Sequence, residues 1–181
     1  MKHILASTAF ASILMCTAAF ADGWVLNPDE SQLSFASVKN DYFGEVHSFQ
    51  TIGGGVSDDG LAEITIDLAS VETMIDIRNE RMIEHVFGSI ATARLTAEFD
   101  MAAMEAIAIG DSAMMEVDAV LSFLGAELDV FTDMYIVRIT DTRVMALSNN
   151  MVFLETDTAG IDAGINVLQE LAGLDHISRA V

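Results

Sequence analysis

The stretch from Leu61 to Leu68, LAEITIDL, alternates apolar and polar side chains. Within it, Ile64, Ile66 and Leu68 fall on one side of an extended chain, and the polar residues between them fall on the other. A period of two is the side-chain repeat of a β-strand, and an apolar set on one side only is typical of a strand with one buried face. The stretch therefore predicts a half-buried strand.

The same alternation recurs along most of the chain, in stretches separated by glycine-rich turn signals. We interpret the triple glycine at 53–55 as one of these turns rather than as a phosphate-binding loop, because the Lys and Ser/Thr of such a loop are missing. The pattern amounts to about seven or eight strands at hairpin spacing, which predicts a sandwich or a barrel. The further strands are expected at residues 31–39, 46–49, 95–100, 116–123, 128–139 and 143–154.

Two segments follow a helical period instead. Residues 75–87 and 162–174 space their apolar side chains three and four positions apart, as amphipathic helices do. The second segment ends at Ala172-Gly173, and glycine commonly follows the last turn of a helix. We therefore expect an all-β domain that carries one or two short helices.

The composition combines strong acidity with strong apolarity. The chain has 181 residues, with 8 Lys or Arg against 28 Asp or Glu, a formal net charge of −20, and 52% hydrophobic residues. The apolar content is ample for a core and excludes a disordered acidic chain. The acidity argues against nucleic acids as partners, because a protein binds their phosphates through a basic face. It also argues against docking on an anionic membrane, which needs a polybasic patch.

The first 21 residues have the organisation of a secretory signal peptide. A lysine at position 2 precedes an uncharged run, Ile4–Ala21, which ends in the A-x-A motif Ala19-Phe20-Ala21. A membrane anchor is the competing interpretation, but the run is rich in Ala, Ser and Thr, and no Lys or Arg follows it to stop transfer. We expect residues 1–21 to be cleaved and residues 22–181 to form one exported domain.

Few residues suggest catalysis or metal binding. Cys16 is the only cysteine and would leave with the signal peptide, so neither a disulfide nor a zinc–thiolate site is expected. His47, His85 and His176 lie far apart, and structural or surface roles compete with catalytic or metal-binding ones. The acidic pairs do not match a calcium loop, and no G-x-S-x-G motif is present. We therefore predict no catalytic residue, no metal site and no enzyme activity.

The methionines and one arginine leave alternatives open. The 11 methionines suit core filling, the lining of a lipid cavity, or copper(I) binding. Arg78 lies among acidic residues of its own expected helix, Asp76 and Glu80 included, which favours surface ion pairs of small energetic value. The alternative is a positive group at a cavity mouth that meets an anionic or carbonyl head group.

An ordered set of short motifs runs from Gly23 to Val181. These motifs are Trp24-x-Leu26-Asn27, Ser31-x-Leu33-Ser34-Phe35 with Lys39, Gly44-Glu45-Val46-His47-x-Phe49 with Gly54, Ile66-Asp67-Leu68-x-Ser70-Val71-Glu72-Thr73, Ile75-x-x-Arg78-Asn79-Glu80 with Phe87, and Ala159-Gly160-Ile161-Asp162-Ala163-Gly164. Together they resemble the YceI-like family of periplasmic, lipocalin-like polyisoprenoid-binding proteins.

The resemblance implies an eight-stranded antiparallel β-barrel with a helix packed beside it, residues 22–181 being a YceI-like lipid-binding domain. It also implies a periplasmic location and a long apolar ligand, such as a polyisoprenoid, an isoprenoid quinone or a fatty-chain amide. The chain departs from the family pattern at His176–Val181, where relatives continue into a closing strand, so we expect the last strand to be missing. It also lacks a basic residue at Met151–Glu155, so no head-group site is carried over to that segment.

These observations lead to one main hypothesis and one rival. The main hypothesis is a periplasmic carrier of an isoprenoid lipid or quinone, with Arg78 as the head-group contact and no other cofactor. The rival is a solid-core barrel that serves as an interaction module of a periplasmic redox or stress system. An inner-membrane protein and a second copy of the chain are the candidate protein partners. The residues expected to line the apolar interior are Leu33, Phe35, Ile64, Ile66, Leu95, Phe99, Leu121 and Phe123.

Overall fold

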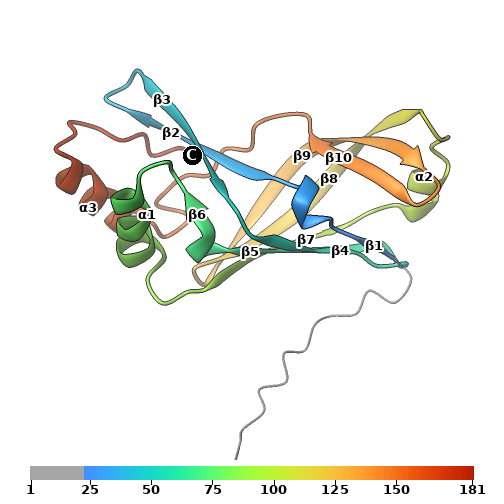
Figure 1. Ribbon diagram of the computed structural model, residues 1–181, viewed down its shortest axis with the longest axis horizontal. Helices are drawn as coiled ribbons and strands as arrows, with labels where there is room; N and C mark the ends of the chain where they lie inside the picture. The colour runs from blue at the N-terminus through green and yellow to red at the C-terminus, as the bar shows by residue number, and fades with distance from the viewer. Residues whose placement is uncertain (1–22) are drawn as a thin grey trace, which may run out of the picture.

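The fold is seen in a computed structural model that describes residues 23–181. The signal-peptide prediction for residues 1–21, together with Cys16, lies outside the described residues. The described chain forms a curled antiparallel sheet, a second small sheet, and short helices at both ends of the molecule (Figure 1).

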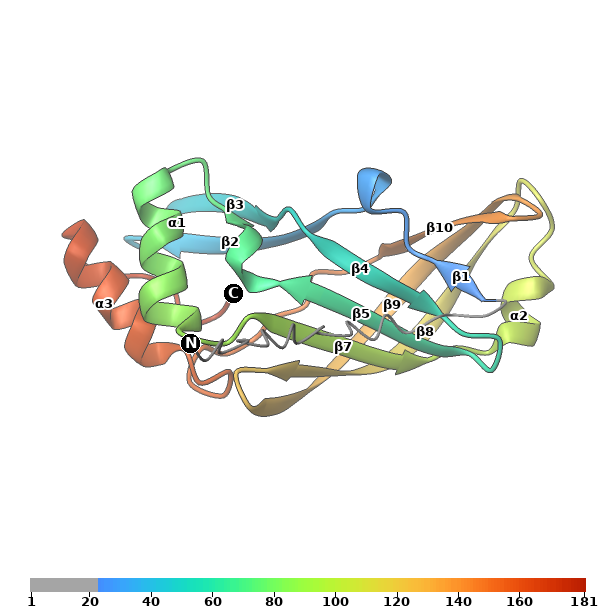
Figure 2. The same ribbon diagram turned by 60° about the horizontal axis from the view of Figure 1, so that its bottom comes forward.

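The larger sheet has seven strands in the order β1-β4-β5-β7-β8-β9-β10, and every neighbouring pair is antiparallel. It twists and curls around one face (Figure 2). The strands are β1 (Trp24–Val25), β4 (Ile52–Val56), β5 (Leu61–Asp67), β7 (Thr92–Glu98), β8 (Ser112–Phe123), β9 (Ala126–Thr140) and β10 (Arg143–Ser148).

The smaller sheet consists of β2 (Leu33–Lys39), β3 (Phe43–Phe49) and β6 (Val71–Glu72). Helix α1 (Asp76–Met82), its π-helical continuation η3 (Ile83–Phe87) and α3 (Asp162–Ala172) lie at the same end of the molecule, beside β2 and β3 (Figures 1 and 2). Helix α2 (Met101–Glu105) lies at the opposite end. Two short 3₁₀ turns, η1 (Pro28–Glu30) and η2 (Leu68–Ser70), complete the elements.

The predicted all-β, lipocalin-like barrel is confirmed, with its strands divided between two sheets. The alternation sets the buried face as expected: on β8, Val117 and Ala119 are buried while Glu116 and Asp118 are exposed. Helix α2 is an addition that the periodicity did not show. It begins after Asp100, whose carboxylate accepts a hydrogen bond from the Ala103 N–H and so caps the helix.

The prediction that Gly53–Gly55 forms a turn is wrong, because these residues are the middle of β4. Gly54 has φ of +125°, a conformation that side-chain-bearing residues rarely adopt, and a Cβ on it would overlap the carbonyl oxygen of Glu63. A Cβ on Gly55 would likewise overlap the carbonyl oxygen of Trp24. Glycine is required here because neighbouring strands approach closely, not because the chain reverses.

The predicted strand 143–154 is also shorter than expected. β10 ends at Ser148, and the chain then bends at Asn149, whose N–H donates to the Asp133 carbonyl. Met151 and Phe153 lie exposed in the irregular segment that follows. The alternation of residues 149–154 therefore does not mark a strand.

Residues 176–181 lie at the end of the described chain, where the resemblance implies a closing strand in relatives. Asn40 donates its N–H to the His176 carbonyl, and Ser178 donates to the Val38 carbonyl, which joins the segment to β2. On the other side, Leu154 and Val181 exchange two backbone hydrogen bonds. Residues 176–181 therefore connect β2 to the segment after β10 through isolated β-bridges, and no strand follows β10 in the described residues.

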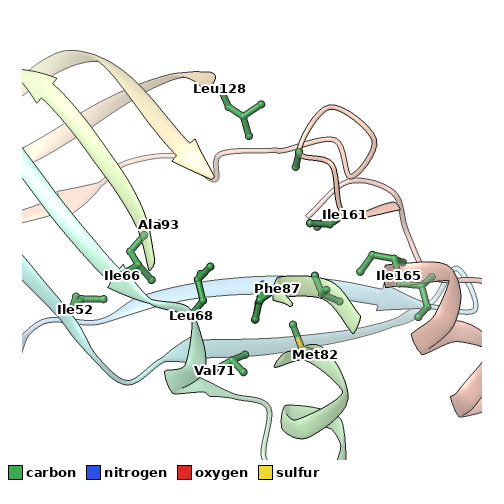
Figure 3. Packing of buried hydrophobic residues seen from close by; sticks show 13 residues of the cluster. Ile52, Ile66, Leu68, Val71, Met82, Phe87, Ala93, Leu128, Ile161 and Ile165 are labelled. Atoms are coloured by element: carbon green, nitrogen blue, oxygen red, sulfur yellow. The ribbon is translucent and has the colours of Figure 1, made fainter. Parts of the chain in front are cut away.

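The interior contains two joined apolar clusters. The first lies between the two sheets and the helices. Leu68 in it is only 1% exposed, and the cluster extends through Phe87 and Met82 to Ile165 (Figure 3). The second lies on the inner face of the larger sheet and consists of small side chains, Ala62, Ala97, Val117, Ala119 and Val130. Leu121 packs against both clusters and connects them.

Candidate ligand-binding interior

Three of the residues expected to line the interior form one row across the larger sheet. Ile64 on β5 lies opposite Leu95 on β7, and Leu95 lies opposite Leu121 on β8. The three side chains share the inner face, because each strand alternates sides and the register is continuous. All three are half-buried, so part of each apolar surface stays accessible.

The neighbouring residues extend this row toward both ends. Ile66 lies two residues along β5 and is buried in the first cluster. Phe123, at the end of β8, is half-buried against the same cluster. Phe99, just after β7, packs against the second cluster.

The remaining two candidates lie on the smaller sheet. Leu33 and Phe35 on β2 pair with Phe49 and His47 on β3, and both pack against the first cluster. All eight residues thus face the interior, from two sheets. Seven of them are half-buried, and Ile66 alone is fully buried.

A line of rings runs through the interior from one sheet to the other. The ring centroids of Phe123 and Phe87 are 6.3 Å apart, those of Phe87 and Phe49 are 6.0 Å apart, and those of Phe49 and Phe35 are 5.2 Å apart. Phe35 is 5.2 Å from the imidazole of His47, where the line ends. These spacings fall in the range of direct aromatic contact.

His47 is a residue whose position the sequence left open. It is 6% exposed, and its Nε2 lies 3.1 Å from the hydroxyl of Ser37. Its Nδ1 is buried and has no hydrogen-bond partner among residues 23–181. Burial lowers the pKa of His47, and the positive charge of Arg78 lowers it further, so the neutral imidazole is favoured near neutral pH. The alternation of β3 could have placed His47 on the same face as Phe49.

Arg78 does not make the surface ion pairs expected with acids of its own helix. Its Nη1 donates to Glu45 Oε2 on β3 at 2.7 Å, and its Nη2 donates to the Thr73 carbonyl at 2.6 Å. Lys39 Nζ lies 2.8 Å from the same Glu45 oxygen. The hydrogen bond from Lys39 lowers the pKa of Glu45 most, with Arg78 adding to the effect. Arg78 therefore lies at the polar end of the interior and shares one carboxylate with Lys39, while its buried Nε has no hydrogen-bond partner among residues 23–181.

A small network fixes Arg78 in this place. Thr73 is 2% exposed, and both its N–H and its hydroxyl donate to the amide oxygen of Asn79, at 2.9 and 2.5 Å. The amide nitrogen of Asn79 donates to Glu72 at 3.2 Å. Helix α1 is thereby tied to β6 and to the residue that follows it.

The other titratable candidates lie elsewhere. His85 is 3.7 Å from Glu84, and His176 is 2.8 Å from Asp41 on the surface. Within the described residues, no three His, Asp or Glu side chains come together as metal ligands. Met82 and Met104 are core residues, whereas Met74 and Met151 are exposed.

Two hollows open on the outside of the molecule. One, of about 480 Å³, lies where β7 and β8 stop pairing and is lined by Glu98, Glu116 and Asp118. The other, of about 360 Å³, lies between α2 and the start of β8. Neither is lined by any of the eight predicted interior residues. In the part of the chain that the structure describes, no helix is long and apolar enough to cross a membrane.

Comparison with solved structures agrees with the fold and with the ordered motifs. A polyisoprenoid binding domain from Saccharophagus degradans, implicated in plant cell wall breakdown, is 33% identical to this chain, with a TM-score of 0.80. The match covers 82% of this chain and 87% of that domain. The chain belongs to the YceI-like family. A second YceI-like structure, BcnA of Burkholderia cenocepacia, matches with a TM-score of 0.63 over 85% of this chain and 92% of BcnA. At 14% identity that likeness shows the fold alone.

Neither a protein-family profile nor a curated protein matches this YceI-like chain. The assignment therefore rests on the motifs, on the Saccharophagus domain, and on a barrel whose inner faces carry the apolar residues.

Proposed function

We propose that this YceI-like protein binds an isoprenoid or another long-chain apolar lipid in its barrel and carries it through the periplasm without catalysing a reaction. The observation that carries the proposal is the partial exposure of the seven half-buried residues on the inner faces of the two sheets. A solid core would bury such side chains, whereas a site for an apolar ligand needs accessible apolar surface. The similarity to a polyisoprenoid binding domain supports the same ligand class.

The driving force is the transfer of the ligand's chain out of water. Each buried methylene contributes about 0.8 kcal/mol before the cost of ordering the ligand is subtracted. The row Ile64, Leu95 and Leu121 offers one apolar wall, and the ring line from Phe123 to Phe35 offers another. The small side chains of the second cluster, Ala62, Ala97 and Ala119 among them, take up little of the interior.

The proposed location rests on the N-terminal sequence and on the charge. The signal-like segment 1–21 directs export in this proposal, and the acidic exterior keeps a lipid-loaded barrel soluble. An inner-membrane protein that delivers or receives the lipid is the candidate partner, and a second copy of the chain is another.

The experiment is to purify the protein from the periplasm with its own leader, extract it with organic solvent, and identify bound molecules by native and lipid mass spectrometry. We expect a co-purifying apolar lipid, and binding of an added isoprenoid quinone. Finding no bound lipid and no quinone binding would overturn the proposal and favour the solid-core interaction module.

A matched pair of variants tests where the ligand lies. Leu95→Trp places a large ring on the inner face of β7, and Thr96→Trp places the same ring on the outer face one residue away. We expect Leu95→Trp to weaken quinone binding at least tenfold and Thr96→Trp to leave it within about twofold, with melting temperatures measured for both. Equal effects of the two variants would place the ligand outside the barrel.

A further inference from the structure

We propose that His47 binds the polar end of the ligand through its Nδ1, and that this end is an uncharged oxygen group, a hydroxyl or a carbonyl, rather than a diphosphate. The inference rests on the proposed function and specifies which lipids the interior accepts.

Position is the first argument. His47 is the last member of the ring line Phe123–Phe87–Phe49–Phe35–His47, and it faces the interior beside Phe35 and Phe49. The next side chains on the same face of the two strands are polar, Ser37 on β2 and Glu45 on β3. A chain that follows the rings would therefore bring its head group to the imidazole.

The unpaired nitrogen is the second argument. Buried polar atoms in folded proteins nearly always have a hydrogen-bond partner, so each exception asks for an explanation. Nδ1 of His47 is such an exception within residues 23–181, in a side chain that is 94% buried. An oxygen of a bound ligand would supply the partner that the protein does not.

The hydroxyl of Ser37 allows either kind of oxygen. If Nε2 accepts a hydrogen bond from Ser37, Nδ1 carries the proton and donates to a carbonyl. If Nε2 donates to Ser37 instead, Nδ1 accepts a hydrogen bond from a hydroxyl. Because a serine hydroxyl can rotate to pair with either tautomer of His47, this site can bind either a prenol or a quinone.

The local charge disfavours a diphosphate. The two cations near His47, Lys39 and Arg78, both bind the carboxylate of Glu45, at 2.8 and 2.7 Å. Nη2 of Arg78 also donates a hydrogen bond to the Thr73 carbonyl. Burial keeps His47 itself uncharged, since it lowers the pKa of the ring. Glu45 offsets one of these two positive charges, so one net positive charge remains here, and the buried Nε of Arg78 has no partner among residues 23–181. A diphosphate carries more than one negative charge and would therefore bring uncompensated charge into an apolar interior, which is unfavourable.

Four probes with one tail test the assignment on the full mature protein. They are geranylgeraniol, menaquinone with a geranylgeranyl tail, geranylgeranyl diphosphate, and the hydrocarbon analogue without a head group. We expect the prenol and the quinone to bind wild-type protein more tightly than the hydrocarbon, and the diphosphate to bind at least tenfold more weakly than the prenol. Tighter binding of the diphosphate than of the prenol would overturn the inference.

Variants then locate the contact. His47→Phe keeps a ring in the line and should weaken prenol and quinone binding by roughly five- to tenfold, a typical value for one hydrogen bond, while leaving the hydrocarbon unchanged. His47→Asn, whose amide reaches the position of Nδ1, should restore part of the loss. His176→Phe, at a surface histidine, is the matched control and should change nothing.

The outcomes separate this inference from the proposed function. If no probe binds, the hydrocarbon included, the lipid-binding proposal fails and this one fails with it. If the hydrocarbon binds as tightly as the prenol, or if His47→Phe weakens all probes equally, lipid binding stands and the role of His47 is overturned. If His47→Phe does not fold, the nitrogen-15 shift of Nδ1 in wild-type protein decides, since only a direct contact would change it differently for prenol and hydrocarbon.

Discussion

Arg78 and Glu45 join helix α1 to strand β3, with Nη1 of Arg78 lying 2.7 Å from Oε2 of Glu45 across 33 positions of sequence. The two side chains are 22% and 31% exposed, so the pair is partly shielded from water. Because the same arginine also donates to the Thr73 carbonyl, it connects α1, β3 and the segment after β6 at the polar end of the interior.

We expect Arg78→Met to lower the free energy of unfolding by about 1–2 kcal/mol, since it removes two hydrogen bonds at a half-buried site. The measurement is urea denaturation of Arg78→Met, Glu45→Gln and the double variant, which isolates the coupling between the two residues. The control is Arg94→Met, because Arg94 pairs with Glu63 while 57% exposed and should contribute less than about 0.5 kcal/mol. Equal losses at both sites would show that the Arg78–Glu45 pair contributes no more to the free energy of unfolding than an exposed ion pair.

The lowered pKa of Glu45 predicts how this contribution depends on pH. A carboxylate whose folded pKa lies below its unfolded value, 4.5, stabilises the fold above that value, and the stabilisation is lost as pH falls through the folded pKa. The stability difference between wild type and Glu45→Gln should therefore be full at pH 6 and shrink steadily below pH 4.5. Denaturation series at pH 6, 4.5 and 3.5 check this, and a difference that stays constant over the series would contradict it.

His47 predicts a second, separate pH window. Burial lowers its pKa from 6.5, so the unfolded chain binds a proton that the folded protein excludes, and stability falls as pH drops below 6.5. His47→Asn has no titrating ring and should lose less stability than wild type between pH 7 and pH 5.5. Thermal unfolding at both values tests this. An equal loss of stability in wild type and His47→Asn over this interval would contradict the prediction.

The strands were predictable because alternation reports burial directly. In β8 the apolar members Val117, Ala119, Leu121 and Phe123 all face inward, and the register with β7 then places Leu95 opposite Leu121. Local periodicity carried this information, since each strand buries one face over its whole length. The inward direction of the eight interior residues could thus be read from the sequence, whereas their role as ligand contacts stays a proposal.

The polar end of the interior could not be predicted in the same way. For Arg78 the spacing favoured ion pairs with acids of its own helix, because helical spacing is local, whereas its partner Glu45 is brought to it only by the tertiary placement of α1 beside β3. The free nitrogen of His47 depends on Ser37, which pairs with the other ring nitrogen from the neighbouring strand. Such contacts are decided by tertiary structure and leave no periodic signal.

At Gly54 the local rule that consecutive glycines form a turn gave the wrong structure. The same residue offers a clear test of stability. Three glycines in a row indicate a turn, but here they let β4 pass close to β5. Gly54→Ala should lower stability by about 3 kcal/mol or more or prevent folding, because the added Cβ overlaps the Glu63 carbonyl and φ is +125°. Gly53→Ala, one residue earlier, has open space around its Cβ and an ordinary φ, so its effect should be within about 1 kcal/mol. Denaturation curves of the two variants check this, and similar losses at both positions would mean that the close approach of β4 to β5 does not explain the glycines.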